Sequence, residues 1–266
     1  MAELPHPLAA FLVAEIRRAR GAAGMTQEAF GRAAGFSASH VSAVESGTRG
    51  LTLDFIRGAD RALNNGGLFE RMVEQLGVPS WFLPWLDAER TATQLRCFQP
   101  CLVPGLLQTE DYARAVIRCD ETLSDQDVEQ RLASRIERQV ILTRDRAPQF
   151  IAVIAEAVLR RAGDDFRDVM AGQIKHLITQ AERTNISAHI LPDEISMHVG
   201  LTGPFSLARS PDHRWVGEME NQLGGVVVDT DADVDTLLSR WETVRNEALP
   251  RRQSIELMKE VVNSWT

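Results

Sequence analysis

Small hydroxyl-bearing side chains are concentrated between Met25 and Arg49, and their spacing fits contact with DNA. Three serines and one alanine recur at helical intervals: Ser39, Ser42, Ala43 and Ser46. Val41 and Val44 fall on a different face of the same predicted helix, so one face can pack while the other meets base edges. Arg49 follows on a loop from which a guanidinium can reach a phosphate.

Two helices joined by a glycine turn must position these side chains. Thr26 is a suitable N-cap for a helix over Gln27–Ala34, and Gly35 supplies a turn that a bulky residue would resist. Ser37 then caps the second helix, which carries the hydroxyl face. The sequence therefore predicts helix, turn and helix.

This pattern extends over Leu8 to about Asn65. The motifs that carry it are Arg20, Thr26-Gln27-Glu28, Ser37 to Ser42 and Glu45-Ser46-Gly47. With these motifs the segment resembles the lambda-repressor-like helix-turn-helix domain of the xenobiotic-response-element (XRE) type regulators. The resemblance implies a structural, buried ion pair between Arg20 and Glu45, and a first contact of Gln27 with phosphate. It also implies that Ser37, Ala38, Ser39, Ser42 and Ala43 lie in the major groove. Adding His40, which could read bases, and Thr48 and Arg49 on the following loop gives the expected DNA-contacting set: Gln27, Ser37, Ala38, Ser39, His40, Ser42, Ala43, Thr48 and Arg49.

The face of the second helix that is predicted to contact bases has few side chains that can distinguish one base from another. It holds no Arg, Gln or Asn, whose bidentate pairs with bases contribute about 1–3 kcal/mol of discrimination each. We therefore expect specificity to depend on His40, on serine hydroxyls, on thymine methyl contacts and on DNA shape, with a homodimer on two half-sites. The competing interpretation is a protein-docking module that keeps the helix-turn-helix shape.

Length and charge separate this segment from the rest. A chain of 266 residues exceeds the usual single domain, and its net charge is −8. Residues 1–66 hold seven arginines and six acidic residues, a net charge of +1, which leaves −9 for residues 67–266. Only the N-terminal part is thus a plausible DNA footprint. We expect three parts: a helix-turn-helix domain at 1–66, a helical connector at 67–92 containing Trp81, Phe82 and Trp85, and a third part at 93–266.

We predict an all-α, five-helix N-terminal domain that is followed along the chain by an α+β part. This third part has a small mixed sheet of about five strands. The expected strands are Phe150–Ile154, Ser187–Leu191, Phe205–Arg209, Arg214–Met219 and Gly225–Val228, with a hairpin turn at Ser210–His213. The expected helices are Thr109–Cys119, Asp125–Leu142, Ala157–Arg161, Asp165–Arg183, Ala232–Ala248 and Arg251–Ser264.

Three segments of this part carry a second resemblance: Phe98 to Arg114, Arg131 to Leu142 and Ile154 to Arg161. They resemble the uncharacterised effector domain of antitoxin-like regulators of actinomycete bacteria (the Scr1-type antitoxin-like family), over roughly residues 75–263. The resemblance implies that this domain receives a signal, either from a small partner protein encoded nearby or from a small ligand.

The sequence offers little for catalysis. It contains no Gly-x-Ser-x-Gly elbow, no P-loop and no His-Glu-x-x-His motif, and its histidines are scattered, so we expect no enzyme, no cofactor and no metal site. Gln108 and Thr109, ahead of a helix start, and Glu156, at a strand end, form the possible ligand or partner site. The competing interpretation, which we favour, is a plain helix entry with Thr109 as the cap and Glu110 and Asp111 in the first turn. The alternative function is an enzyme or small-molecule sensor domain targeted to DNA by the N-terminal head.

Cysteines and hydropathy bear on the compartment. No apolar run approaches the ~20 residues of a membrane span, and Met1–Leu12 lacks the basic start of a signal peptide, so we expect a cytoplasmic, nucleoid-associated protein without membrane contact. Three cysteines, at 97, 101 and 119, are then expected to be reduced. Cys97 and Cys101 lack further ligands at metal spacing, and we expect them to pack in a turn.

Overall fold

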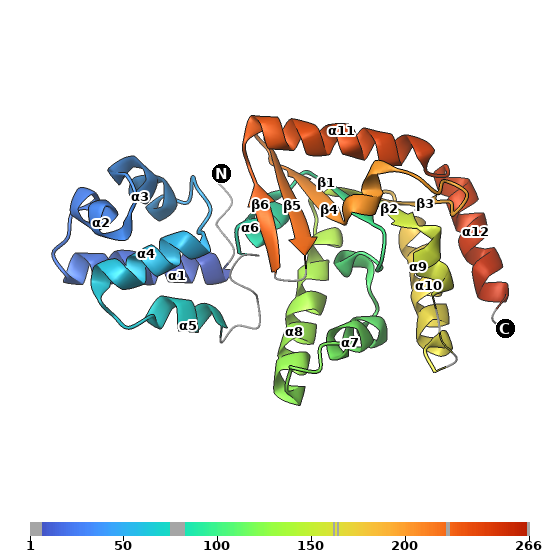
Figure 1. Cartoon of the computed structure of the whole chain (residues 1–266), viewed down its shortest axis with the longest axis horizontal. Helices are drawn as coiled ribbons and strands as arrows, with labels where there is room; N and C mark the ends of the chain where they lie inside the picture. Colours follow the sequence, from blue (N-terminus) through green and yellow to red (C-terminus); the bar gives the residue numbers. More distant parts are fainter. Residues whose placement is uncertain (1–6, 75–82, 162, 164, 222–223, 265–266) are drawn as a thin grey trace. The chain divides into compact units, whose positions relative to one another are not determined.

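The computed structural model describes residues 7–74, 83–161, 163, 165–221 and 224–264. The chain divides into a helical unit over residues 1–91 and an α+β unit over residues 92–266, where Gly224–Val227 is assigned to the α+β unit because it lies in a strand of that unit's sheet (Figure 1). Each unit is described by itself below.

Six α-helices lie in the described part of the helical unit. They are α1 (Pro7–Ala22), α2 (Gln27–Ala34), α3 (Ala38–Glu45), α4 (Leu53–Leu63), α5 (Leu68–Glu74) and α6 (Leu83–Thr91). The predicted caps are present, since Thr26 accepts a hydrogen bond from the amide of Ala29 and Ser37 accepts one from the amide of His40. Fully buried apolar side chains hold the first four helices together: Leu12, Ile16, Phe30, Val41, Phe55 and Ile56.

The fifth helix packs with the helices that precede it. Helix α5 lies within the expected connector, but the carboxylate of Asp60 on α4 accepts the amides of Phe69 and Glu70, both at 3.0 Å. Phe69 is 3% exposed and Val73 is fully buried, so α5 contributes to the same core. The helical unit therefore extends beyond residue 66. In the second half of the connector, Trp85 is buried and its indole donates to Glu89, whereas Trp81 and Phe82 lie outside the described residues.

The α+β unit is organised around a mixed sheet of six strands in the order β3-β2-β1-β4-β5-β6. The strands are β1 (Gln94–Gln99), β2 (Gln149–Ala155), β3 (Ile186–Leu191), β4 (Phe205–Arg209), β5 (Trp215–Asn221) and β6 (Gly224–Val228). Strands β1, β2 and β3 are parallel, and β4 pairs antiparallel with both β1 and β5. The mixed sheet, its five predicted strands and the turn at Ser210–His213 are confirmed.

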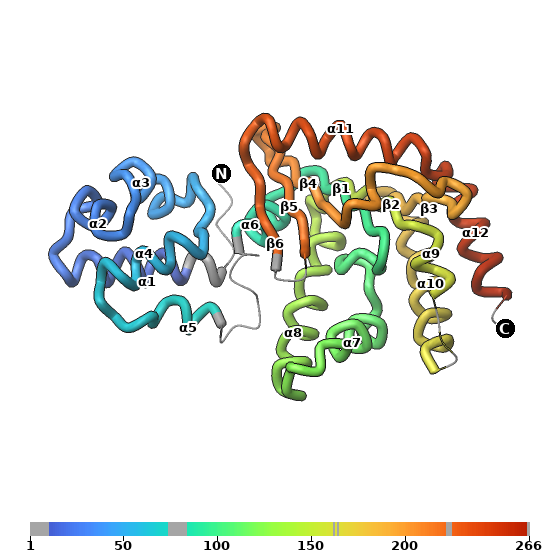
Figure 2. The backbone as a smooth tube through the Cα atoms, in the orientation of Figure 1, coloured from blue at the N-terminus to red at the C-terminus, as the bar shows by residue number. Residues whose placement is uncertain are grey.

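The sixth strand, β1, was not predicted. It pairs with β2 on one side and β4 on the other, although β4 follows it by more than a hundred residues (Figure 2). Cys97 belongs to this strand and is 7% exposed, so the prediction that it packs in a turn is wrong. The segment is too short and too mixed in composition to indicate a buried strand without its partners.

Helices cover the sheet from both sides (Figure 1). They are α7 (Glu110–Arg118), α8 (Asp125–Arg138), α9 (Glu156–Arg160), α10 (Arg167–Ala181), α11 (Asp231–Glu247) and α12 (Arg251–Asn263). Helix α11 runs along one face, where Leu237, Trp241 and Val244 form a core with sheet residues such as Phe98 and Leu207. In the part of the chain that the structure describes, no helix is long and apolar enough to cross a membrane.

Candidate nucleic-acid interface

The turn between α2 and α3 depends on glycine. Gly35 ends α2 with φ of 89°, in the left-handed region that favours glycine. Gly31 on α2 meets the carbonyl of Phe36 so closely that an added Cβ would lie 2.6 Å from its oxygen. This close packing fixes the angle at which α3 leaves the turn.

A cluster of three polar side chains ties α3 to α1 and α2. Nε of Arg20 lies 2.6 Å from Oε1 of Glu45, and its Nη2 lies 2.9 Å from Oε2, so the expected ion pair is present and bidentate. The amide of Gln27 donates to the same Oε2 at 2.9 Å. Burial alone would raise the pKa of Glu45, but the hydrogen bonds from Arg20 and Gln27 outweigh it and hold that pKa below its ordinary value.

This cluster changes the interpretation of Gln27. The resemblance assigns it to phosphate, but here its amide nitrogen is used within the protein and the residue is half-buried. Gln27 is therefore a positioning residue for the ion pair. Sequence spacing gave no signal for this contact, because Gln27 and Glu45 are 18 residues apart.

The outward face of α3 carries the predicted small and hydroxyl-bearing residues. Five hydroxyl-bearing residues on and around it are exposed: Ser37, Ser39, Ser42, Ser46 and Thr48. Ala38 and Ala43 are half-buried between them, while Val41 and Val44 are buried on the inward face as predicted. The hydroxyl of Thr48 donates to the carbonyl of Ala43 at 3.1 Å, so Thr48 closes the end of the helix as well as flanking the face.

His40 does not belong to this face, and its predicted role in reading bases is corrected. Its ring stacks on Phe55 with centroids 5.8 Å apart and contacts Phe36 at 4.6 Å. Nε2 is buried without a hydrogen-bond partner in the described structure. The cause is helical geometry: His40 precedes the buried Val44 by four residues, so both side chains point inward.

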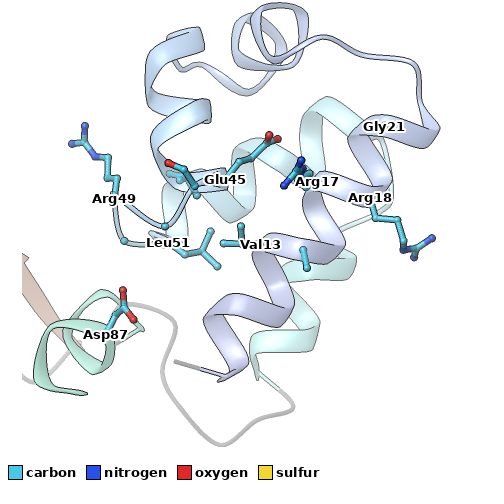
Figure 3. Close-up of a pocket in the computed structure, with 13 residues that line it drawn as sticks. Val13, Arg17, Arg18, Gly21, Glu45, Arg49, Leu51 and Asp87 are labelled. Carbon is cyan, nitrogen blue, oxygen red and sulfur yellow. The ribbon is translucent and has the colours of Figure 1, made fainter. Parts of the chain in front are cut away.

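A hollow opens beside the C-terminal end of α3 (Figure 3). Arg17 from α1 and Arg49 from the following loop contribute guanidinium groups to its lining, and Val13, Val44 and Leu51 contribute apolar surface. Both arginines are exposed. Arg17 was missed by the sequence analysis; the available signal was its position one helical turn before Arg20, which places both on the face of α1 that meets α3.

The polar loop of the second unit is occupied by its own protein. Gln108 is 3% exposed; its amide donates to the carbonyl of Val103 at 2.7 Å and its Oε1 accepts from Arg135 at 3.0 Å. Gln173 accepts the backbone amide of Thr109 at 2.7 Å and donates to the carbonyl of Leu107 at 2.8 Å. Thr109 caps α7 by accepting the amide of Tyr112. Gln108 and Thr109 therefore position the loop, and the idea that they face a ligand is corrected.

Glu156 has separate partners. Its Oε1 accepts from Arg160 at 2.7 Å and its Oε2 accepts the amide of Asp193 at 3.2 Å, so it holds the segment after β3. The structure does not bring it together with Gln108 and Thr109 by any hydrogen bond among the described residues.

Burial raises the pKa of Cys97 to about 12, which keeps this thiol protonated.

Two family models match different parts of the chain. Residues 12–67 match a family model described as a helix-turn-helix domain, and residues 83–260 match one described as a domain of unknown function, DUF5753. No curated protein and no solved structure matches the chain. The N-terminal unit is thus a helix-turn-helix DNA-binding domain.

Proposed function

We propose that this chain, which belongs to the family of the domain of unknown function DUF5753, is a transcriptional regulator of the XRE type. In this proposal α3 enters the major groove of DNA, where Ser39, Ser42 and Ala43 meet base edges. Arg49 and Arg17 bind backbone phosphates on the side of the hollow. Thr48 and Ser37 lie at the two ends of the contact surface.

One observation supports the proposal above the others. The inward face of α3 is fixed by buried valines and by the ion pair to Arg20, whereas its serine face is exposed and has no packing role. A protein-docking module would need a larger apolar surface there, because protein interfaces are enriched in aromatic residues, methionine and arginine at their centre. The serine face suits hydrogen bonds and water-mediated contacts to DNA.

With His40 turned inward, the reading face is poorer than the sequence indicated. Serine hydroxyls bond several bases with similar geometry, and no bidentate side chain remains on α3. We therefore propose that the protein binds as a homodimer on two half-sites, where two weak contacts and DNA shape combine to give specificity.

In vitro selection from random duplexes with the full chain tests the proposal. We expect a motif with two-fold symmetry and half-sites separated by about one helical turn, roughly 10 base pairs. Arg49→Ala and Arg17→Ala should each weaken binding to selected and random duplexes alike, and should reduce the slope of log K against log salt by about 1. Ser42→Ala should instead reduce the preference for the selected duplex.

The matched control is Arg57→Ala, which removes the same charge from α4, where Arg57 pairs with Glu70 at 2.7 Å. It should leave the salt slope unchanged. A double Arg17→Ala/Arg49→Ala variant with the wild-type slope would contradict the phosphate assignment. A selection that yields no enriched motif would contradict sequence-specific binding.

For the second unit we propose a signal-receiving, antitoxin-like role without catalysis, in a cytoplasmic protein. Two observations support it: the helix-turn-helix unit supplies DNA binding, and three polar residues that could have formed a reactive site are hydrogen-bonded within the protein, namely Gln108, Thr109 and Glu156. The −9 charge of residues 67–266 also disfavours contact with DNA.

A further inference from the structure

Lysine is rare in this chain and is found in one place. Of the 29 basic residues only two are lysines, Lys175 and Lys259; all the others are arginines. The two lysines come from different helices, α10 and α12, and line the same hollow. A lysine differs from an arginine in carrying a compact charge on a flexible stem, so it can follow a carboxylate whose position varies.

Helices α10 and α12 lie side by side (Figure 1), and this hollow together with its neighbour is here called the groove. The neighbouring hollow is also lined by Lys259. Three partly or fully buried apolar side chains line the two hollows: Ile178, Ile255 and Val262. The groove therefore has an apolar floor between charged edges.

The charged edges are mainly positive. The groove carries four cations and two carboxylates: Lys175, Lys259, Arg251, Arg252, Glu182 and Glu256. Lys175 has no ion pair among the described residues, and Lys259 lies 3.8 Å from Glu256, with both side chains more than half exposed, so that pair contributes little. Arg251 donates to the carbonyls of Ala181 and Arg183 and so joins the two helices. Lys175, Lys259 and Arg252 remain to meet a ligand.

We propose that this groove binds an acidic, amphipathic segment of a partner protein. The apolar side chains of the segment contact the apolar floor, and its carboxylates pair with Lys175 and Lys259. This rests on the proposed signal-receiving role and names the kind of partner. The negative charge of residues 67–266 opposes DNA at this position. A small anion would leave the apolar floor unused, and face-to-face pairing of two copies would bring the lysines of both copies close together.

Fluorescence anisotropy with the full chain tests the proposal. The probe is a labelled synthetic helical peptide with a leucine stripe flanked by glutamates. We expect binding that weakens as salt is raised, and that falls at least tenfold in Lys175→Glu/Lys259→Glu. Replacing the peptide's glutamates by glutamines, or its leucines by serines, should weaken binding as well, and Lys175→Arg/Lys259→Arg should retain most of it.

The matched control is Arg146→Glu/Arg214→Glu, which changes net charge equally at two exposed positions outside the groove and should leave peptide binding unchanged. Circular dichroism of each variant checks folding. No binding to the wild-type chain, or equal binding to the lysine variant, overturns the proposal. Self-association that Lys175→Glu/Lys259→Glu abolishes also overturns it, in favour of a second copy. The lysine variant should bind the selected duplex normally, whereas Arg17→Ala/Arg49→Ala should lose the duplex and keep the peptide, so each proposal can fail alone.

Discussion

At the scale of single residues, the helix-turn-helix unit depends on one enclosed ion pair. The side chains of Arg20 and Glu45 are 14% and 6% exposed, so neither charge is well hydrated if the other is removed. Replacing one partner of such a pair typically costs about 3–5 kcal/mol, because the remaining charge is stranded.

Arg20→Met should therefore reduce the free energy of unfolding of the helical unit by about 3 kcal/mol, the lower end of that range, since Gln27 still donates to Glu45. Hydrogen exchange of α2 and α3 amides measures this unit separately from the rest. The double variant Arg20→Met/Glu45→Leu should recover part of the loss. If both variants are equally destabilised, stranded charge is not the cause.

His40 makes the stability of the same unit depend on pH. Burial lowers the pKa of its imidazole and the nearby charge of Arg49 lowers it further. Above the ordinary value of about 6.5 the ring is neutral in both folded and unfolded chains. Below that value the unfolded chain binds a proton at His40 that the folded chain does not bind. The free energy of unfolding therefore falls as the pH drops from about 7 toward the lowered pKa.

His40→Phe should remove this dependence while keeping the ring contacts with Phe36 and Phe55. The measurement is the unfolding free energy of α2 and α3 amides between pH 7.5 and pH 5 in both chains. His213→Asn, at an exposed turn residue, is the control and should retain the wild-type slope. An unchanged slope in His40→Phe would refute the assignment.

The residues of the site were only partly predictable, for a physical reason. Helical spacing sufficed for the valines and serines of α3, since inward and outward faces follow from the period of 3.6. The same spacing places His40, four residues before Val44, on the inward face. Contacts between helices, such as Gln27 with Glu45, depend on tertiary packing that spacing within one helix does not report.

At the scale of elements, α2 and α4 cross at a glycine. A Cβ on Gly58 would lie 2.5 Å from the carbonyl oxygen of Ala34, a backbone atom that cannot yield without moving a helix. Gly21 on α1 has nothing within 4 Å of the same position. The two glycines therefore make a matched pair, one required by close approach and one not.

Gly58→Ala should destabilise the helical unit by about 1–3 kcal/mol, the range for overpacking a close contact. Gly21→Ala should stabilise it by up to about 1 kcal/mol, because alanine is the better helix former. Thermal unfolding followed by helical circular dichroism compares them. Effects of opposite sign, with Gly58→Ala destabilising and Gly21→Ala stabilising, would support the packing argument, and stabilisation by Gly58→Ala would refute it.

Elements that are specified by their own residues were predicted from the sequence. Strand β1, whose place depends on its partner strands, was not. Helix α7 begins after Thr109, as the cap residue and the acidic first turn indicated. Strand β1 is defined by partners at Gln149–Ile154 and Phe205–Arg209, and nothing within its own six residues specifies that central position. Local pattern gives element type more reliably than sheet order.

At the scale of the whole molecule, the packing of α5 adds residues to the helical unit beyond the helix-turn-helix match. The helix-turn-helix match ends at residue 67 and the second match begins at residue 83. Helix α5 lies between them, yet Asp60 caps it and it buries Phe69 and Val73 in the helical unit. A charge count cannot detect such a contact, because it depends on two apolar side chains and one carboxylate.

A fragment of residues 1–74 should therefore be markedly more stable than a fragment of residues 1–66. Burying two apolar side chains of this size contributes about 3–6 kcal/mol in total, which is comparable with the entire stability of a small domain. Thermal unfolding of both fragments measures the difference, and Phe69→Ala in the longer fragment should reproduce much of it. Asp60→Ala should add a smaller loss, because it leaves the first amides of α5 uncapped. Equal stability of the two fragments would mean that the helix-turn-helix unit is complete without α5, and that the boundary expected from composition is the correct one.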